Sequence, residues 1–542
     1  MSRFVDTMVA TATSAEGRKR GMTTGEPHEP AHRTWAQVHE HATRIAGALG
    51  VDRGAAVAVL AGDPAEIAPA VQAAWLAGGS ITMLHQPTAR TDLAEWAADT
   101  LRVLAMVEAR LVLLGAPFDA LAGVLDQHGV AYRRIADLDG PPLTAPVPVG
   151  EGDTALLQLT SGSTAHPKAV RITHGNLWSN ASAMRVAAKL DPEVDRMVSW
   201  LPLFHDMGMV GFLTVPMLFG IDLVKVTPAD FLRGPTLWPD LISRYGGTIT
   251  AAPNFAYAIA ARRMANVDDG AYDLSRLRIA LNGAEPIDPA AVRAFVDAGA
   301  RFGMPAECVM CAYGMAETTL GVAFAPAFTG MAVDTVDPEA LAAHHRAVPS
   351  TSPDARTFPL LGPPLPDLEV CVVDESGAVL GEREVGQLRV RGEAVTPGYL
   401  TVDGPVATRD ATGWLATGDE GYLVDGQVVV CGRRKDVIIM GGRNIYPTDV
   451  ERAAASVEGV RAGNAVAVRL DAGTRRERFA VVVESKHADD EEAVRDLSRK
   501  IITRVVDAVG LRPFAVVVLG PGSLPKTPSG KLRRSAAAAL VP

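Results

Sequence analysis

Thr160-Ser-Gly-Ser-Thr-Ala-His-Pro-Lys168 follows directly on the apolar run Ala155-Leu-Leu-Gln-Leu159. A strand that leads into a hydroxyl-rich loop suits triphosphate binding, because backbone N–H groups and hydroxyls donate to phosphate oxygens and a glycine lets the backbone come close. The residues that would serve this purpose are Thr160, Ser161, Gly162, Ser163, Thr164 and Lys168. Taken alone, the loop fits a solvated Ser/Thr turn equally well. It contains no Gly-x-x-x-x-Gly-Lys-[Ser/Thr] pattern, which points away from kinases and motor ATPases.

The composition limits the class of protein. The chain has 542 residues, 48% of them hydrophobic, and a formal net charge of −10. Its length exceeds one compact core, so we expect at least two domains. The acidic balance argues against a nucleic-acid partner. We expect no membrane span and a cytoplasmic location, because no apolar run approaches the roughly 20 residues of a membrane helix and the start of the sequence has no signal-peptide core.

Cys308-Val-Met-Cys311 is the one C-x-x-C pattern, and it could be half of a redox or metal site. It has no second C-x-x-C, and it lies in a short apolar segment. On a strand, side chains three positions apart point to opposite faces. We therefore predict two buried, reduced cysteines.

Helix and strand signals alternate through the first part of the chain. Thr34 can cap a helix, because apolar residues recur at helical spacing from residue 35 to residue 49. Asp63-Pro-Ala-Glu66 is typical of a second helix start, with a cap, a first-turn proline and an acid that returns to the cap. Short apolar runs predict buried strands at residues 55–61, 81–84 and 111–114. This order predicts an α/β fold with helices covering a parallel sheet.

Beyond residue 361 the pattern changes to short strands separated by Gly and Asp turns. We expect a small antiparallel β subdomain with strands at residues 369–374, 386–391 and 427–431. After Cys431 the signals become α+β again. We place the main boundary near residues 432–436, which gives a large N-terminal domain over residues 1–432 and a small C-terminal domain over residues 433–542.

Two kinds of segment could carry chemistry. Trp200-Leu-Pro-Leu-Phe-His-Asp-Met-Gly-Met-Val-Gly211 sets His205 and Asp206 among aromatic, Met and Gly residues, which suits a polar gate at the mouth of an apolar pocket. A satisfied turn histidine would have the same pattern. Asn282-Gly-Ala-Glu-Pro286 and Ala312-Tyr-Gly-Met-Ala-Glu-Thr318 each follow an apolar strand, where α/β sheets place their ligand crevice.

Individual side chains in these segments have suitable chemistry for a nucleotide. Tyr313 offers a stacking face, and Glu317 offers a hard oxygen ligand suited to Mg²⁺. Asp419, in Thr417-Gly-Asp-Glu-Gly421, could accept hydrogen bonds from ribose hydroxyls. Lys531 lies on the glycine-containing tail Leu524-Pro-Lys-Thr-Pro-Ser-Gly-Lys-Leu-Arg-Arg534.

In this order and spacing, the segments resemble the adenylate-forming enzymes, which include acyl-CoA synthetases, nonribosomal-peptide adenylation domains and luciferases. The resemblance covers essentially the whole chain. It implies ATP and Mg²⁺ as cofactors and residues 160–168 as the phosphate loop. Ala165 and Ala169 stand where family members often carry glycine, so the loop would be less mobile here.

The resemblance also implies roles for single residues. The adenine slot and its neighbours would be Gly283, Ala284, Glu285, Pro286, Tyr313, Gly314 and Met315. The ribose pair would be Asp419 and Arg433, and Lys435 would sit at the hinge of a mobile C-terminal domain. Catalysis would involve Lys531, Glu317 and His205, with Glu317 and Thr164 near the metal. The acyl pocket would include Trp200, His205, Met209, Phe212 and Phe255.

Three segments favour one branch of this superfamily, the fatty acyl-AMP ligases. Ala251-Ala-Pro-Asn-Phe-Ala-Tyr257 and Gly442-Arg-Asn-Ile-Tyr-Pro447 are similar to segments of those enzymes, although forms related to the second occur in CoA ligases. Residues 325–360 resemble the insertion that accompanies poor use of CoA. A neutral surface loop is the alternative. The apolar content and helix-like residues 338–346 favour a packed element.

These observations predict ATP-dependent activation of a medium- or long-chain fatty acid to acyl-AMP with release of pyrophosphate. The acyl group would then pass to the phosphopantetheine thiol of a holo-acyl carrier protein. One alternative is a fatty acyl-CoA ligase, with CoA as acceptor. Another is an inactive acyl-adenylate or fatty-acid binding protein, which would have no need of Lys531, Glu317 and Asp419 together.

Overall fold

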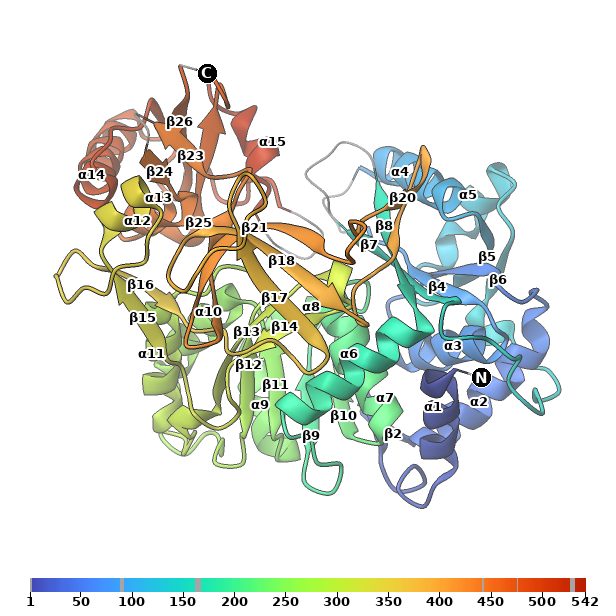
Figure 1. The fold of residues 1–542 in the computed structure, drawn as a ribbon. Coiled ribbons are helices and arrows are strands. Elements are labelled where there is room, and N and C mark those ends of the chain that lie inside the picture. Colours follow the sequence, from blue (N-terminus) through green and yellow to red (C-terminus); the bar gives the residue numbers. More distant parts are fainter. Residues whose placement is uncertain (1, 88–91, 161–166, 441–442, 475, 527–531) are drawn as a thin grey trace.

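The computed structural model describes residues 2–87, 92–160, 167–440, 443–474, 476–526 and 532–542 (Figure 1). Ser161, Gly162, Ser163, Thr164 and Lys531, all predicted site residues, lie outside this described part. The fold is mixed α/β, as predicted, with two large sheets and several small antiparallel ones.

The first large sheet has eight strands, and its central strands are parallel. Antiparallel strands close both ends, β14 beside β13 and β2 beside β1. In spatial order the strands are β14 (Gly321–Phe324), β13 (Val309–Gly314), β12 (Ile279–Asn282), β11 (Ile249–Ala252), β9 (Arg196–Ser199), β10 (Asp222–Lys225), β1 (Gly21–Thr24) and β2 (Ala31–Thr34).

The second large sheet also has eight strands, five of them joined in parallel. In spatial order they are β20 (Gly404–Ala407), β19 (Gly398–Thr401), β8 (Lys168–Thr173), β7 (Thr154–Thr160), β4 (Ser80–Met83), β3 (Ala56–Leu60), β5 (Ala109–Leu114) and β6 (Tyr132–Arg134). Strands β19 and β20 come from far along the chain and extend this sheet through β8.

The predicted antiparallel subdomain is present as a four-stranded sheet. Its strands are β17 (Leu368–Val373), β18 (Gly386–Gly392), β21 (Leu415–Val424) and β22 (Gln427–Arg433). A three-stranded sheet follows near the C-terminus, with β25 (Val460–Leu470), β26 (Arg478–Ser485) and β27 (Ala515–Leu519). There are also two antiparallel strand pairs. They are β15 (Val333–Val336) with β16 (Arg356–Pro359), and β23 (Ile438–Met440) with β24 (Arg443–Ile445).

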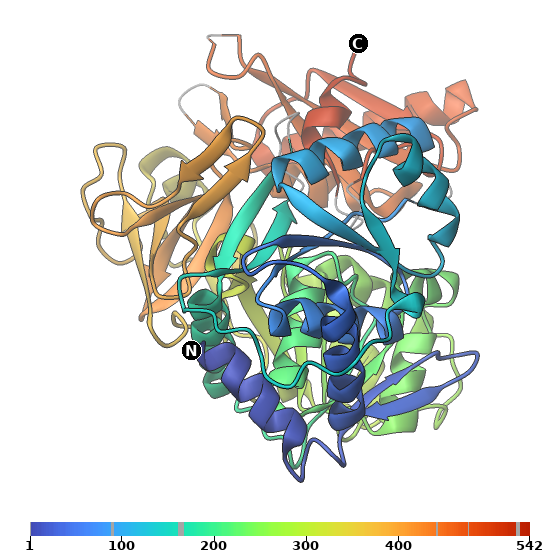
Figure 2. The same cartoon turned by 90° about the vertical axis from the view of Figure 1, so that its right-hand side faces the viewer.

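Helices cover the sheets. In the first part of the chain they are α1 (Arg3–Thr13), α2 (Trp35–Leu49), α3 (Pro64–Leu76), α4 (Leu93–Met106), α5 (Ala122–Gln127), α6 (His174–Ala187), α7 (Val215–Phe219), α8 (Pro228–Arg233), α9 (Leu237–Tyr245), α10 (Asn254–Met264) and α11 (Pro289–Ala300). The later ones are α12 (Pro338–His344), α13 (Pro447–Ala455), α14 (Glu491–Val509) and α15 (Arg534–Ala538). The C-terminal helices and strands lie at the top of both views, beyond the two large sheets (Figures 1 and 2).

Local sequence explains where these helices begin. The Thr34 side chain accepts from the Gln37 N–H, and the Gln37 side chain returns to Thr34, which makes a capping box. The Asp63 side chain caps α3 through the Ala65 N–H. The prediction that Glu66 also returns to this cap is wrong: its Oε2 accepts from the Ala116 N–H at 2.8 Å and so ties α3 to the loop after β5.

One hydrophobic core joins the two large sheets. It contains Val57 and Ile172 from the second sheet, Ala280 and Val224 from the first, and Leu177 from α6 between them. Burial of this continuous apolar surface fixes the two sheets relative to each other. Cys308 and Cys311 are buried free cysteines, as predicted, and burial raises the pKa of each thiol to about 12.

Candidate active site

A large cavity of about 2740 Å³ lies where several strands of both sheets end. Parallel strands bring their carboxyl ends to one edge, and the loops that follow them line a common crevice. Thr160 ends β7, Trp200 follows β9, Gly283 follows β12 and Gly314 ends β13. All four residues line the cavity. The C-terminal part of the chain supplies a further wall through residues that include Arg461 and Lys526.

The structure brings most of the predicted site residues to this cavity. Those that line it are Thr160, Lys168, Trp200, His205, Phe212, Phe255, Gly283, Ala284, Glu285, Pro286, Tyr313, Gly314, Met315, Glu317, Asp419, Arg433 and Lys435. Met209 is different, because its side chain is completely buried and does not belong to the lining. The place of Met209 in the acyl pocket stays a prediction.

On the polar wall of the cavity, Asp419 contacts both Tyr313 and Arg433. The Tyr313 hydroxyl donates to Asp419 Oδ2 at 2.5 Å. Arg433 lies opposite Asp419 in the β21–β22 register, with its Nε 3.6 Å from Asp419 Oδ1. Burial raises the pKa of the Asp419 carboxyl, and the Arg433 charge opposes that rise. The result is a fixed acceptor beside an aromatic ring, an arrangement suited to a ribose next to a purine.

Glu317 forms a second polar cluster with a residue that sequence reasoning missed. The Tyr399 hydroxyl donates to Glu317 Oε1 at 2.6 Å. Lys168 Nζ lies 3.8 Å from the same oxygen and 3.9 Å from the centre of the Tyr399 ring. Tyr399 reaches this position because β19 pairs with β8, which carries Lys168 at its start. The local sequence does not predict that β19 pairs with β8, which lies more than 200 positions earlier in the chain.

The donor set around Glu317 fits a divalent cation shared with a polyphosphate. Mg²⁺ is usually held by one or two carboxylates together with substrate phosphates and water. Glu317 lines the cavity with 13% of its side chain exposed. Among the described residues there is no cluster of three or more His, Cys, Asp or Glu that could hold a metal alone. A Mg²⁺ held beside Glu317 would take phosphate and water oxygens as further ligands.

His205 and Asp206 stand at the cavity as a pair. His205 Nδ1 lies 2.7 Å from Asp206 Oδ1, and the same oxygen accepts from the Met207 N–H at 2.7 Å. Gly208 is required in this turn, because a Cβ there would approach the Pro202 carbonyl oxygen to 2.1 Å. The π-helix Met207–Thr214, which includes Gly208, begins directly after His205 and Asp206, and such helices occur often at functional sites.

A second histidine, His85, lines the same cavity and was not found from the sequence. It follows β4, and its ring lies 5.5 Å from that of Phe204 in an edge-on arrangement. Burial lowers the pKa of His85 to about 4. Because it follows a short strand without any recognisable motif, only the three-dimensional structure connects it with His205.

Apolar side chains line the remainder of the cavity. Trp200 stacks on Phe231, with ring centres 4.0 Å apart, and meets Phe255 edge-on at 6.3 Å. Other apolar lining residues come from strand interiors and helices, and include Met184, Met197, Phe212, Ile249, Ala251 and Leu281. One cavity thus combines a polar wall with an extended apolar part, which suits an amphipathic substrate.

Lys435 lies in the turn after β22, where the sequence predicts the hinge. Burial lowers the pKa of its ammonium group. Its backbone carbonyl accepts from Arg469 Nη1 at 3.3 Å, a contact with β25 of the C-terminal sheet. The position of the domain boundary itself stays a prediction.

Within the described ranges, the helices are all too short or too polar to cross a membrane.

Comparison with known proteins places this site in a family. The family described as "AMP-binding enzyme" matches residues 12–400. The chain belongs to the AMP-binding enzyme family. It is therefore an adenylate-forming ligase.

Individual relatives in this family agree with that membership. A putative ligase, Rv1013 of Mycobacterium tuberculosis (strain ATCC 25618 / H37Rv), is 56% identical over the full length of both chains. A putative acyl-CoA synthetase of Caulobacter vibrioides is 36% identical over 77% of this chain and 74% of its own length. A solved structure from work on fatty acyl-adenylate ligases of E. coli and L. pneumophila superimposes with a TM-score of 0.90 at 30% identity, covering 100% of this chain and 98% of that one.

Proposed function

We propose that this AMP-binding enzyme activates a medium- or long-chain fatty acid with ATP to give acyl-AMP and pyrophosphate. It then passes the acyl group to the phosphopantetheine thiol of an acyl carrier protein. The observation that carries the first half is the large cavity, in which Tyr313, Asp419 and Glu317 face the same space as a long apolar lining. The likeness to fatty acyl-adenylate ligases supports a fatty acid as the apolar partner.

The chemistry assigns a task to each polar group. A carboxylate oxygen attacks the α-phosphorus, the bond to the β-phosphate oxygen breaks, and pyrophosphate leaves with the negative charge. Lys168, the backbone and hydroxyl donors of residues 160–168, and Lys531 would offset that charge, while Asp419 and Tyr313 orient the nucleoside. Preorganised donors of this kind are typically worth about 3–4 kcal/mol each on deletion. Mg²⁺, when bound beside Glu317, would supply Lewis-acid stabilisation of the phosphates.

We divide the chain into residues 1–432, which bind both substrates, and residues 433–542, which carry Lys531. Such a division lets the small domain close for adenylation and rearrange for transfer. Two buried clusters support it, since they consist wholly of residues beyond 433.

The choice of a carrier protein as acceptor rests on residues 325–360. This insertion is a packed element: β15 pairs with β16, and α12 places Leu341 in a buried cluster with Phe358 and Tyr446. Arg356 lies between two rings, 4.4 Å from the centre of Phe358 and 4.2 Å from that of Tyr446. Its Nε is 2.9 Å from Asp449 Oδ1. Because Tyr446 and Asp449 lie beyond the proposed boundary, the insertion ties the two domains together and opposes the rearrangement for transfer. A whole carrier protein has binding surface to offset that opposition, whereas free CoA has little.

The second candidate function is a fatty acyl-CoA ligase, which the Caulobacter relative favours. Parallel assays separate the two: enzyme, ATP and a fatty-acid panel are incubated, and CoA and holo-carrier protein are offered in separate reactions. We expect acyl-carrier protein to form at least ten times faster than acyl-CoA. Efficient acyl-CoA formation would overturn the choice of acceptor. Pyrophosphate release with aryl or amino acids alone would overturn the fatty-acid assignment.

Lys531→Ala tests the proposed catalytic lysine. Acyl-adenylate formation should fall at least 100-fold, while thermal stability and ATP binding stay near those of the wild type. Lys500→Ala is the matched control, because Lys500 is exposed on α14 and pairs only with Asp496 among the described residues. Near-normal adenylation by Lys531→Ala would remove Lys531 from the mechanism.

A further inference from the structure

Three apolar side chains form a row across the first large sheet, deep below the carboxyl ends of the strands. Ile249 lies opposite both Met197 and Ile279 in the strand register. All three line the cavity and are at most 4% exposed. Two residues further along the strands, Ala251 and Leu281 form a second row on the same face. The cavity therefore follows the strands over their length, between these two rows.

The deep row has a polar boundary immediately behind it. Arg196, Thr248 and Arg278 directly precede Met197, Ile249 and Ile279 in the sequence. The Thr248 hydroxyl donates to Asp195 Oδ1 at 2.9 Å, and Arg278 Nη1 donates to the same oxygen at 2.5 Å. The Asp195 side chain is completely buried.

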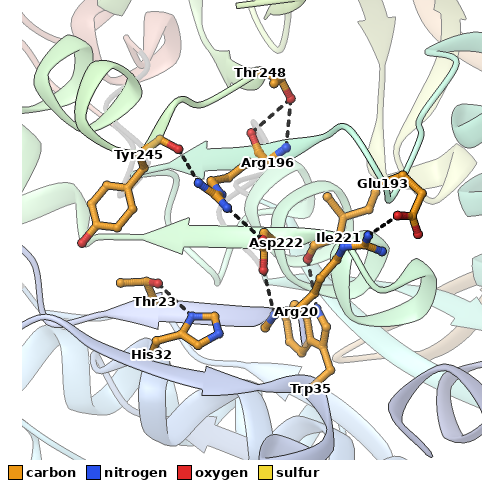
Figure 3. Close-up of polar contacts among 11 residues, drawn as sticks. Arg20, Thr23, His32, Trp35, Glu193, Arg196, Ile221, Asp222, Tyr245 and Thr248 are labelled. Carbon is orange, nitrogen blue, oxygen red and sulfur yellow. Dashed lines mark hydrogen bonds and ion pairs between the residues drawn. The ribbon is translucent and has the colours of Figure 1, made fainter. Parts of the chain in front are cut away.

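This boundary stops an alkyl chain. Advancing past the row would place methylenes against a buried carboxylate and its donors, and would disturb the hydrogen bonds from Thr248 and Arg278 to Asp195. Figure 3 shows the neighbouring part of this edge, where Arg196 Nη1 donates to the Tyr245 carbonyl oxygen at 2.6 Å and Arg196 N–H donates to Thr248 Oγ1 at 2.9 Å. We call Met197, Ile249 and Ile279 the floor.

The depth of the floor gives a length. Gly283, at the adenylate end, is four residues beyond Ile279, which corresponds to about 13 Å of strand. Carbon–carbon bonds of about 1.5 Å in a zigzag advance about 1.3 Å per carbon, so about ten carbons span the distance.

We propose that Met197, Ile249 and Ile279 set the acyl-chain length, and that the preferred substrate is a fatty acid of about ten carbons. This inference rests on the proposed function and specifies the substrate class of the same site. Up to the floor, each methylene removed from water should raise kcat/KM by about fourfold. Beyond it, added carbons would meet the polar boundary and kcat/KM should fall.

The test measures pyrophosphate release with saturated fatty acids of six to eighteen carbons. For the wild type, kcat/KM should peak near ten carbons and fall at least tenfold by sixteen. Met197→Ala deepens the pocket and should move the peak by about two carbons towards longer acids. Ile279→Phe fills the floor and should move it towards shorter ones.

Met22→Ala is the matched control. Met22 is buried on β1 of the same sheet, is separated from Met197 by β10 and lies outside the cavity lining, so its loss leaves a comparable core cavity away from the pocket. Its chain-length profile should match that of the wild type. The two floor variants act in opposite directions, so a general loss of stability cannot produce both results.

A wild-type profile that stays level from ten to eighteen carbons would overturn the floor while leaving fatty-acid activation intact. Profiles of Met197→Ala and Ile279→Phe that both coincide with the wild type would do the same. Absence of turnover with every fatty acid would overturn both the floor and the proposed function.

Discussion

The two ends of the first large sheet are built from the same strands and serve opposite purposes. At the carboxyl end, polar side chains such as Glu317, Tyr313 and His205 face a large cavity. At the amino end, polar side chains bind one another: Asp222 accepts from Arg196 Nη2 at 3.2 Å and from the Gly21 N–H at 2.9 Å, and the Trp35 indole donates to the Ile221 carbonyl oxygen at 3.0 Å (Figure 3). One end is available for a ligand, and the other stabilises the sheet.

This contrast predicts that substitutions at the carboxyl end reduce activity with little effect on stability, and that those at the amino end do the reverse. The largest effect should come from Glu317→Gln. It removes the charge that would face Mg²⁺ but keeps an oxygen that can accept from Tyr399, so the fold should be retained. We expect kcat for pyrophosphate release to fall about 100-fold, with the melting temperature almost unchanged. A variant with full activity would show that Glu317 has no role in charge stabilisation.

The second prediction concerns pH. His174, at the start of α6, is completely buried, and burial lowers its pKa to about 4 from an ordinary value of 6.5. The unfolded chain therefore takes up a proton at a higher pH than the folded chain does. The contribution of His174 to the free energy of unfolding is fully present above pH 6.5. It is lost progressively as the pH falls from 6.5 to 4, and the total loss is on the order of 3 kcal/mol.

Urea unfolding at several pH values measures that loss. His174→Phe should flatten the slope between pH 6.5 and pH 4, although His85, whose pKa is also lowered to about 4, should leave part of it. Equal slopes for the variant and the wild type would mean that His174 does not titrate in this range.

Glu26→Ala should have the third largest effect, at a position outside the cavity lining. The Glu26 carboxylate is 3% exposed and accepts from the Tyr245 hydroxyl at 2.7 Å and from Arg244 Nη1 at 3.0 Å. Its removal leaves these donors without an acceptor and should cost about 2 kcal/mol. Thermal unfolding should occur at a lower temperature, while kcat/KM at 25 °C per folded molecule stays within twofold. A large loss of activity at unchanged stability would contradict a purely structural role for Glu26.

The smallest effect is expected for Asp222→Asn. Asp222 is 21% exposed and Arg196 is 40% exposed, so water screens their attraction. The asparagine can still accept from the Gly21 N–H. We expect a loss of about 0.5–1 kcal/mol in urea unfolding and no change in chain-length preference. A shift in that preference would show that the polar boundary behind the floor extends to Asp222.

Much of the fold could be predicted because apolar periodicity and caps are local. Thr34 and the strands near residues 55–61 and 427–431 depend on their own neighbourhoods, and the structure has an element at each. Tyr399 could not be predicted as a site residue, because the pairing of β19 with β8 brings it to Glu317. The floor was equally hidden, since Met197, Ile249 and Ile279 look like ordinary buried strand residues until their register and their contact with the cavity are known.

One error also has a local cause. Glu66 has the right spacing for a capping box, but the Ala116 N–H offers it a partner in a neighbouring loop. Met209, which was grouped with its neighbours in an apolar segment, is completely buried, and its place in the acyl pocket stays a prediction. The roles of Ser161, Gly162, Ser163, Thr164 and Lys531 still rest on the sequence.

The position of Arg356 has a consequence for rates. Under the proposed division, its contacts with Tyr446 and Asp449 would have to break before the C-terminal domain could turn away. If these contacts together contribute roughly 3 kcal/mol to the barrier, the turning step is slowed about 100-fold, since each 1.4 kcal/mol is a factor of ten. Unhindered domain motions occur in microseconds to milliseconds. A delay of that size would hold acyl-adenylate in the closed site long enough for a slowly diffusing macromolecular acceptor to arrive.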